Sequence, residues 1–250
     1  CIRDSEGTSV KPVAVIDHHN PKPIKQRMGF KDIRPNVAAA ATIASTYLQE
    51  QGLTPGPALA TALIYAIRTE TKGSDNPFSA LDVKILSWLN PFADHNQLNE
   101  IENAPLPRDY FSDLLLALES TFIYDNVALC FLPYASGPET IGEVADLLIR
   151  CENINSLLCV GFIAPNVLVS CRTAEGAEDA TDVLTRTLQG IGYCGGHEQR
   201  AGGKLIVDES RTKMTEEMQS DLRSRWLGAT GKSDRRGSRL VAKKDILDHL

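Results

Sequence analysis

The segment Val13-Ala14-Val15-Ile16-Asp17-His18-His19 is the starting point for interpreting this chain. Its first four residues form a short apolar run rich in β-branched side chains, which is typical of a strand covered on both faces in a parallel sheet. Asp17, His18 and His19 then lie at the carboxyl end of that strand, where open α/β sheets bind ligands. Imidazoles beside a carboxylate suit a divalent transition ion such as manganese, while capping polar residues are the alternative.

The pattern that follows predicts an α/β fold with two domains. Helices are expected over residues 36–48, 57–68, 79–89 and 108–122. After these, strands alternate with helices: strand 127–132, helix 139–150, strands 157–163 and 167–171, helix 177–191 and strand 205–207. We therefore expect part of a parallel-sheet domain over residues 1–105, a connector helix over 106–124, a smaller α/β domain over 125–208, and a C-terminal helix with a basic tail over 209–250.

Composition limits the function classes. The chain has 250 residues, and 26 Lys and Arg against 32 Asp and Glu give a formal net charge of −6, which argues against wrapping long nucleic acid. No window approaches the roughly 18–20 consecutive apolar residues of a membrane helix, so no membrane span is expected. The six cysteines form no C-x-x-C pair, and most have aliphatic neighbours. They predict reduced thiols in a cytoplasmic protein.

A second candidate site lies in a glycine-rich segment far along the chain. The pairs Gly195-Gly196 and Gly202-Gly203 allow close backbone approach, and His197 is positioned to donate to a phosphate. The alternative is a glycine-rich turn between a helix and a strand. Arg172 closes a predicted strand and suits bidentate phosphate binding. Its alternative role is a surface ion pair with Glu175 or Glu178.

Together, Val13-Ala14-Val15-Ile16-Asp17-His18-His19 and Gly195-Gly196-His197-Glu198-Gln199-Arg200-Ala201-Gly202-Gly203 resemble the signatures of the DHH phosphoesterases with a DHHA1 domain. Their order and their separation by a helical connector make the resemblance specific. It extends to about Asp208 and is closest to the bifunctional oligoribonucleases and pAp phosphatases, with RecJ-like exonucleases more distant. Further similarity lies in Asp32-Ile33-Arg34-Pro35, Ile67-Arg68-Thr69-Glu70-Thr71, Ala145-Asp146-Leu147-Leu148-Ile149-Arg150 and Val169-Ser170-Cys171-Arg172-Thr173.

The resemblance implies a role for each matching residue. His18 matches a metal-ligating histidine, Asp17 a carboxylate that orients the site, and His19 a histidine that supports the metal or contacts phosphate. Glu70 stands where many members carry a metal-binding aspartate, with a structural helix cap as its alternative. Asp4 is a weak match to a further upstream ligand. Arg172, Gly195, Gly196 and His197 match the part of the family that holds the terminal nucleotide.

The implied activity is manganese-dependent hydrolysis of short oligoribonucleotides or pAp-type nucleotides in a cleft between the two domains, with two Mn²⁺ ions in the complete family site. The family also carries a histidine and aspartates upstream that this sequence does not show. We therefore expect a polypeptide that lacks roughly a hundred residues at its front, as judged from typical domain sizes, and that is impaired in hydrolysis. The rival hypothesis is a non-catalytic nucleotide-binding module. Expected partners are short RNA, nucleotide phosphates and a second copy of the chain.

Overall fold

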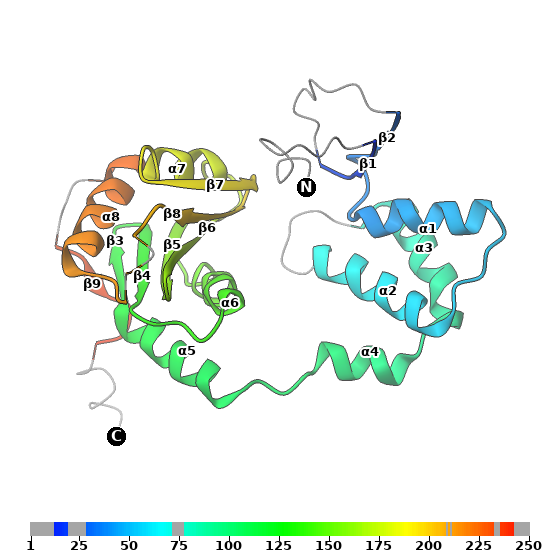
Figure 1. Ribbon diagram of the computed structural model, residues 1–250, viewed down its shortest axis with the longest axis horizontal. Coiled ribbons are helices and arrows are strands. Elements are labelled where there is room, and N and C mark those ends of the chain that lie inside the picture. The colour runs from blue at the N-terminus through cyan, green and yellow to red at the C-terminus, as the bar shows by residue number, and fades with distance from the viewer. Residues whose placement is uncertain are drawn as a thin grey trace. The chain divides into compact units, whose positions relative to one another are not determined.

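The computed structural model describes residues 13–19, 29–71, 78–208, 210, 212–232 and 236–242. The chain divides into two compact units, Cys1–Pro105 and Leu106–Leu250. Each unit combines strands with helices, which confirms the predicted α/β class (Figure 1).

The first unit has two short strands followed by helices. Its elements are β1 (Ala14–Asp17), β2 (Phe30–Ile33), α1 (Ala40–Glu50), α2 (Pro57–Thr71), α3 (Ala80–Leu89), a 3₁₀ turn (Asn90–Phe92) and α4 (His95–Glu102). The strands β1 and β2 pair in parallel, with Asp17 opposite Ile33. Val15 is buried, but Ile16 is 42% exposed. The expected burial of both strand faces is therefore wrong for the described residues, because a two-stranded sheet with α1 against it leaves one face open.

A buried carboxylate joins the helices of this unit. Asp82, in the first turn of α3, is fully buried. It accepts hydrogen bonds from the backbone N–H of Ala38 (3.0 Å), from the hydroxyl of Thr42 (2.5 Å) and from Ser79. Ser79 in turn caps α3 by accepting from the Asp82 backbone N–H. The capping box therefore also fixes the start of α1 against α3, beside an apolar core that includes Ile64, Ile67, Ile85 and Leu89.

The second unit is built on a seven-stranded mixed sheet with the order β7-β8-β6-β5-β4-β3-β9. Its strands are β3 (Thr121–Tyr124), β4 (Val127–Leu132), β5 (Ser156–Ile163), β6 (Asn166–Thr173), β7 (Gly192–His197), β8 (Arg200–Leu205) and β9 (Ser238–Arg239). Its helices are α5 (Arg108–Ser120), α6 (Pro138–Leu148), α7 (Ala180–Thr187) and α8 (Glu216–Ala229). The strand expected over 205–207 lies earlier in the chain, as β8, because its pairing with β7 ends at Leu205.

The two faces of this sheet carry separate cores. Side chains from α7 and α8, including Leu184 and the fully buried Trp226, pack on one face. Side chains from α5 and α6, including Ala117 and Val144, pack on the other, as Figure 1 shows. The structure therefore places α8 and β9, from the expected C-terminal segment, and α5, from the expected connector, within the second unit.

Helix hydrophobicity and the cysteine side chains bear on the environment of the protein. None of the helices in the described part of the chain has the length and hydrophobicity that crossing a bilayer requires. The five cysteines at positions 130, 151, 159, 171 and 194 are free thiols. Burial raises the pKa of the Cys171 thiol to about 12, so this sulfur stays protonated at neutral pH.

The contact between β5 and α6 requires glycine at position 161. A Cβ on Gly161 would lie 2.6 Å from Cγ1 of Ile141, which is itself only 2% exposed. We predict that Gly161→Ala lowers the free energy of unfolding by about 1–3 kcal/mol, because the packed core cannot make room. Urea unfolding followed by tryptophan fluorescence measures this change.

Gly228 provides the matched control, because a Cβ there has no neighbour within 4 Å on the exposed side of α8. Gly228→Ala should leave stability unchanged or raise it by up to about 1 kcal/mol through helix propensity. Equal unfolding curves for the parent and Gly161→Ala would show that the β5–α6 contact is looser than described.

Candidate functional site

The predicted triplet Asp17, His18 and His19 forms a cluster at the end of β1. Each residue offers one ligand atom, and these three atoms lie within 4.8 Å of one another. The rings of His18 and His19 are tilted against each other, with centroids 4.3 Å apart. All three side chains are partly exposed or exposed. A carboxylate and two imidazoles that converge in this way fit the donor set of a divalent transition ion.

Asp17 also orients its neighbour within this cluster. Its Oδ1 lies 2.6 Å from Nδ1 of His19 and accepts the backbone N–H of His19 at 3.1 Å. Burial raises the pKa of the Asp17 carboxyl, but the hydrogen bonds from His19 outweigh this and hold the pKa below its ordinary value. Asp17 is therefore a carboxylate at neutral pH. His19 therefore contacts Asp17 through Nδ1, and this contact fixes the orientation of the imidazole ring, including its second nitrogen Nε2.

The strand next to β1 supports this position. The backbone N–H of Arg34 donates to the carbonyl of Asp17 at 2.9 Å. The guanidinium of Arg34 binds Asp32 through Nε (2.9 Å) and Nη2 (2.8 Å), and the Tyr47 hydroxyl of α1 donates to the same carboxylate. Hydrogen bonds from Arg34 and Tyr47 lower the pKa of Asp32. The polar residues of the Asp32-Ile33-Arg34-Pro35 segment thus tie β2 to α1.

The structure does not bring Glu70, a further predicted ligand, into this cluster. Glu70 is exposed in the last turn of α2, outside the group formed by Asp17, His18 and His19. Its position at the carboxyl end of the helix, where the dipole disfavours an anion, argues against the alternative of a helix cap. Asp4 lies outside the described residues.

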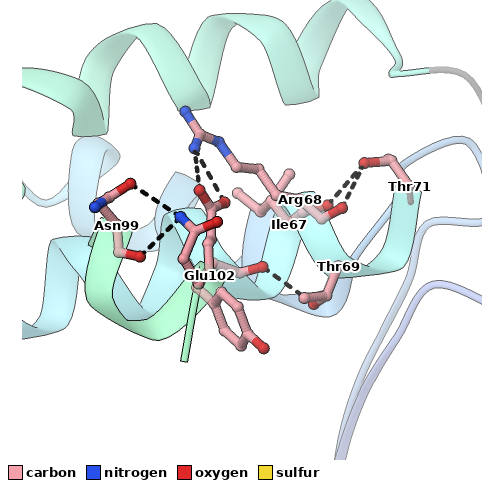
Figure 2. A network of polar contacts seen from close by, with 8 residues as sticks. Ile67, Arg68, Thr69, Thr71, Asn99 and Glu102 are labelled. Carbon is pink, nitrogen blue, oxygen red and sulfur yellow. Dashed lines mark hydrogen bonds and ion pairs between the residues drawn. The ribbon is translucent and has the colours of Figure 1, made fainter. Parts of the chain in front are cut away.

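The residues around Glu70 have structural partners of their own (Figure 2). Arg68 donates to both carboxylate oxygens of Glu102 on α4, at 3.1 and 3.3 Å. The hydroxyls of Thr69 and Thr71 donate back to carbonyls of the preceding turn. Within the Ile67-Arg68-Thr69-Glu70-Thr71 segment, these side chains hold the end of α2 and its contact with α4.

In the second unit, Arg172 on β6 is bound to a residue that the sequence analysis gave no role. Its Nε donates to Oδ1 of Asp146 on α6 at 2.6 Å, and Nη1 donates to the Ser170 hydroxyl at 2.7 Å and to the Cys171 carbonyl at 3.0 Å. The alternative role of Arg172, an ion pair with Glu175 or Glu178, is wrong, because its guanidinium binds Asp146 of α6 instead. Glu178 pairs with Arg186 instead.

The glycine-rich segment forms a two-stranded edge of the sheet. Gly195, Gly196 and His197 lie in β7 and pair with Gly202, Ala201 and Arg200 of β8. The alternative of a glycine-rich turn between a helix and a strand is therefore wrong. A Cβ on Gly196 would lie 2.8 Å from the Cβ of Ala201, and one on Gly203 would lie 2.5 Å from the Tyr193 carbonyl oxygen. Close pairing of β7 with β8 depends on these glycines.

The hairpin tip is fixed to its surroundings. The carbonyl of Gln199 accepts the backbone N–H of Thr173 at 3.1 Å, and the carbonyl of Glu198 accepts the hydroxyl of Thr173 at 3.3 Å. Glu198 also accepts the backbone N–H of Ala180, the first residue of α7. These bonds hold the tip of the hairpin beside the end of β6 and set the register of the two strands.

The pairing of β6, β8 and β7 places two arginines and one histidine opposite one another on three neighbouring strands. Arg172 of β6 is opposite Arg200 of β8, which is opposite His197 of β7. Directly opposed residues share a sheet face, so these positions form one row on the side of α6. Nη2 of Arg200 lies 3.7 Å from Oδ1 of Asp146. Next along the strands, Ser170, Gly202 and Gly195 form a row with little side-chain bulk.

Sequence reasoning missed Asp146 and gave Arg200 little weight. Arg200 and Lys204 alternate with Ala201 and Leu205, and this period of two is a strand signal that Gly202 and Gly203 weaken. The pairing of Arg200 with Arg172 is seen only in the structure. Asp146 offers no comparable signal, because it reaches Arg172 across 26 positions of sequence.

Comparisons with known proteins were consistent with this architecture. No protein-family model matches the chain. The uncharacterized protein MJ1633 of Methanocaldococcus jannaschii is 29% identical over 192 residues, which cover 76% of this chain and 39% of that protein. This chain thus corresponds to less than half the length of the curated relative that it matches.

Two solved structures were compared in the same way. A pGpG-specific phosphodiesterase, PggH, from Vibrio cholerae matches 88% of this chain and 80% of its own, with 14% identity and a TM-score of 0.41. An exopolyphosphatase-related protein from Bacteroides fragilis matches 92% of this chain and 68% of its own, with 15% identity and a TM-score of 0.70. The second likeness shows a shared fold, and the α/β class expected from the sequence is confirmed.

Proposed function

We propose that this chain is part of a phosphoesterase of the DHH type with a DHHA1 domain, and that it acts on short oligoribonucleotides or pAp-type nucleotides. The observation that carries the proposal is the cluster of Asp17, His18 and His19, whose ligand atoms lie within 4.8 Å of one another at a strand end. The shared fold and the paired glycine strands of the second unit support it. The net charge of −6 fits a short substrate that needs only a few local cations.

The donor set of the cluster fits a divalent ion, and we propose Mn²⁺. His18 and a carboxylate oxygen of Asp17 would hold it, with His19 kept in orientation by Asp17. When bound, such an ion polarises a phosphate oxygen and stabilises the charge that develops during hydrolysis. Three ligand atoms are fewer than a pair of ions requires. We therefore propose that Glu70, Asp4 or residues outside the described ranges complete the centre.

In the second unit, we propose that the row of Arg172, Arg200 and His197, which we call the phosphate row, receives the phosphate of the substrate. A guanidinium has five N–H donors. Arg172 uses four of them on Asp146, Ser170 and the Cys171 carbonyl, so it is poorly placed for the bidentate grip expected from the sequence. The side chain of Arg200 is 31% exposed against 13% for Arg172, so it is the more accessible of the two guanidinium groups. Arg200 is therefore the principal phosphate ligand, and Arg172 a supporting charge beneath it.

The rival function is a module that binds nucleotides without hydrolysing them. It is favoured by the incomplete ligand set among the described residues. Both functions require nucleotide binding at the glycine strands, but only the enzyme requires His18 to hold a metal ion.

We predict that His18→Ala weakens Mn²⁺ binding by at least tenfold, because it removes an imidazole from a cluster of three donors. Calorimetric titration of the purified chain with MnCl₂ measures the affinity. In a longer polypeptide that includes the upstream coding sequence, His18→Ala should also abolish Mn²⁺-dependent release of phosphate from pAp.

The matched control is His95→Ala, which removes an exposed histidine on α4, outside the cluster, and should change neither quantity. Equal Mn²⁺ affinity in His18→Ala and the parent would contradict the ligand assignment. A longer polypeptide that binds pAp but does not hydrolyse it would favour the non-catalytic module.

A second prediction concerns the phosphate row. Arg200→Gln should weaken binding of pAp by roughly 10- to 150-fold, since one charge-assisted contact to phosphate is lost and such a contact contributes roughly 1.5–3 kcal/mol. Calorimetric titration with pAp in the absence of metal measures this effect separately from the cluster in the first unit.

Arg186→Gln serves as the control, because Arg186 is also a surface arginine of the second unit but binds Glu178 and the Ala229 carbonyl. If Arg200→Gln and Arg186→Gln reduce pAp affinity equally, general charge rather than the row accounts for binding.

A further inference from the structure

Tyr193 is an exposed aromatic side chain on the edge strand β7. It retains 72% of its accessible surface, more than any other aromatic side chain among the described large hydrophobic residues. Its partner across the ladder is Lys204 of β8, which is also exposed. Neither residue has a role in the phosphoesterase proposal so far.

The alternation of β7 and β8 fixes the sheet face on which Tyr193 lies. Cys194, Ala201 and Leu205 pack into the core beneath α7 and α8. Tyr193, Gly195, Gly202 and Lys204 are out of phase with them and therefore point to the opposite face. Arg172 identifies this as the α6 face, because its guanidinium binds Asp146 of α6.

Among the described residues of the second unit, no helix packs on the outer strands of this face. The helix α6 packs on β5 and β6, farther in along the sheet (Figure 1). Gly202, Lys204 and Tyr193 are all exposed. Gly195 and Gly202 are opposite each other. They therefore leave a stretch of backbone without side chains between the phosphate row and the Tyr193–Lys204 pair.

We propose that Tyr193 stacks on the base of a nucleotide whose phosphate is held at Arg200, so that the substrate class of this face is a nucleotide rather than an inorganic polyphosphate. The inference rests on the proposed function and deepens it. The Tyr193–Lys204 pair is four residues from the phosphate row, or about 13 Å along the strands. A nucleotide has its phosphate and its base at opposite ends of a ribose, and the glycine stretch gives that ribose room.

The charges support the same occupant. Lys204 adds a cation beside the aromatic ring, and Arg200 and Arg172 add two at the other end of the glycine stretch, next to the carboxylate of Asp146. An inorganic polyphosphate has no planar ring to stack on the Tyr193 side chain and would gain more from a basic side chain at position 193. A nucleobase gains stacking surface from that ring, with Lys204 available to a further phosphate.

The test compares AMP with ribose 5-phosphate, which shares the phosphate and sugar but has no base. Calorimetric titrations of the full chain should give AMP an affinity at least fivefold higher than that of ribose 5-phosphate. Tyr193→Ala should remove this preference and leave the affinity for ribose 5-phosphate within twofold. Tyr193→Phe should retain the preference, because it keeps the ring.

Tyr134→Ala is the matched control, since Tyr134 is 65% exposed in the loop after β4, at a distant strand of the same sheet. It should bind both compounds as the parent does. Equal affinities of the parent for AMP and ribose 5-phosphate, or a preference that survives Tyr193→Ala, would overturn the base-stacking role while leaving phosphate binding intact. If the parent binds neither compound, the phosphate row of the proposed function fails, and the stacking role fails with it.

Discussion

The close pairing of β7 with β8 is the constraint on which the second unit's candidate site depends. At positions 196 and 203, a side chain would collide with the partner strand, so only glycine permits the observed approach. The pairing sets the register that brings Arg200 beside Arg172 and places Tyr193 opposite Lys204. Without it, the charges and the aromatic ring would not lie on one sheet face.

A comparable dependence holds in the first unit on a smaller scale. Pairing of β1 with β2 positions Asp17 at the strand end, and the Arg34 backbone N–H binds the Asp17 carbonyl there. The carboxylate of Asp17 then orients His19. In both units, main-chain hydrogen bonds fix the positions, and one carboxylate arranges the cationic or imidazole side chains next to it: Asp17 in the first unit and Asp146 in the second.

Local sequence patterns predicted the parts of the structure that depend on local physics. The helix α1 was predictable from the helix propensity of its Ala-rich sequence, and α2, α3 and α5 from apolar spacing. The strand-end position of Asp17 followed from the apolar run before it. The strands β7 and β8 were not predicted, because glycines carry no apolar alternation and their pairing is set by close backbone approach. The Asp146–Arg172 contact was not predictable either, since it joins α6 to β6 through the packing of the helix on the sheet.

Binding of a nucleotide at the glycine strands of the second unit can be observed by amide chemical-shift mapping of ¹⁵N-labelled protein during titration with AMP. We expect the largest shift changes on Tyr193, Gly195, Arg200, Gly202 and Lys204, on the two paired strands. Largest changes on α8, or on the helices α1 to α4 with β7 and β8 unaffected, would contradict binding at these strands.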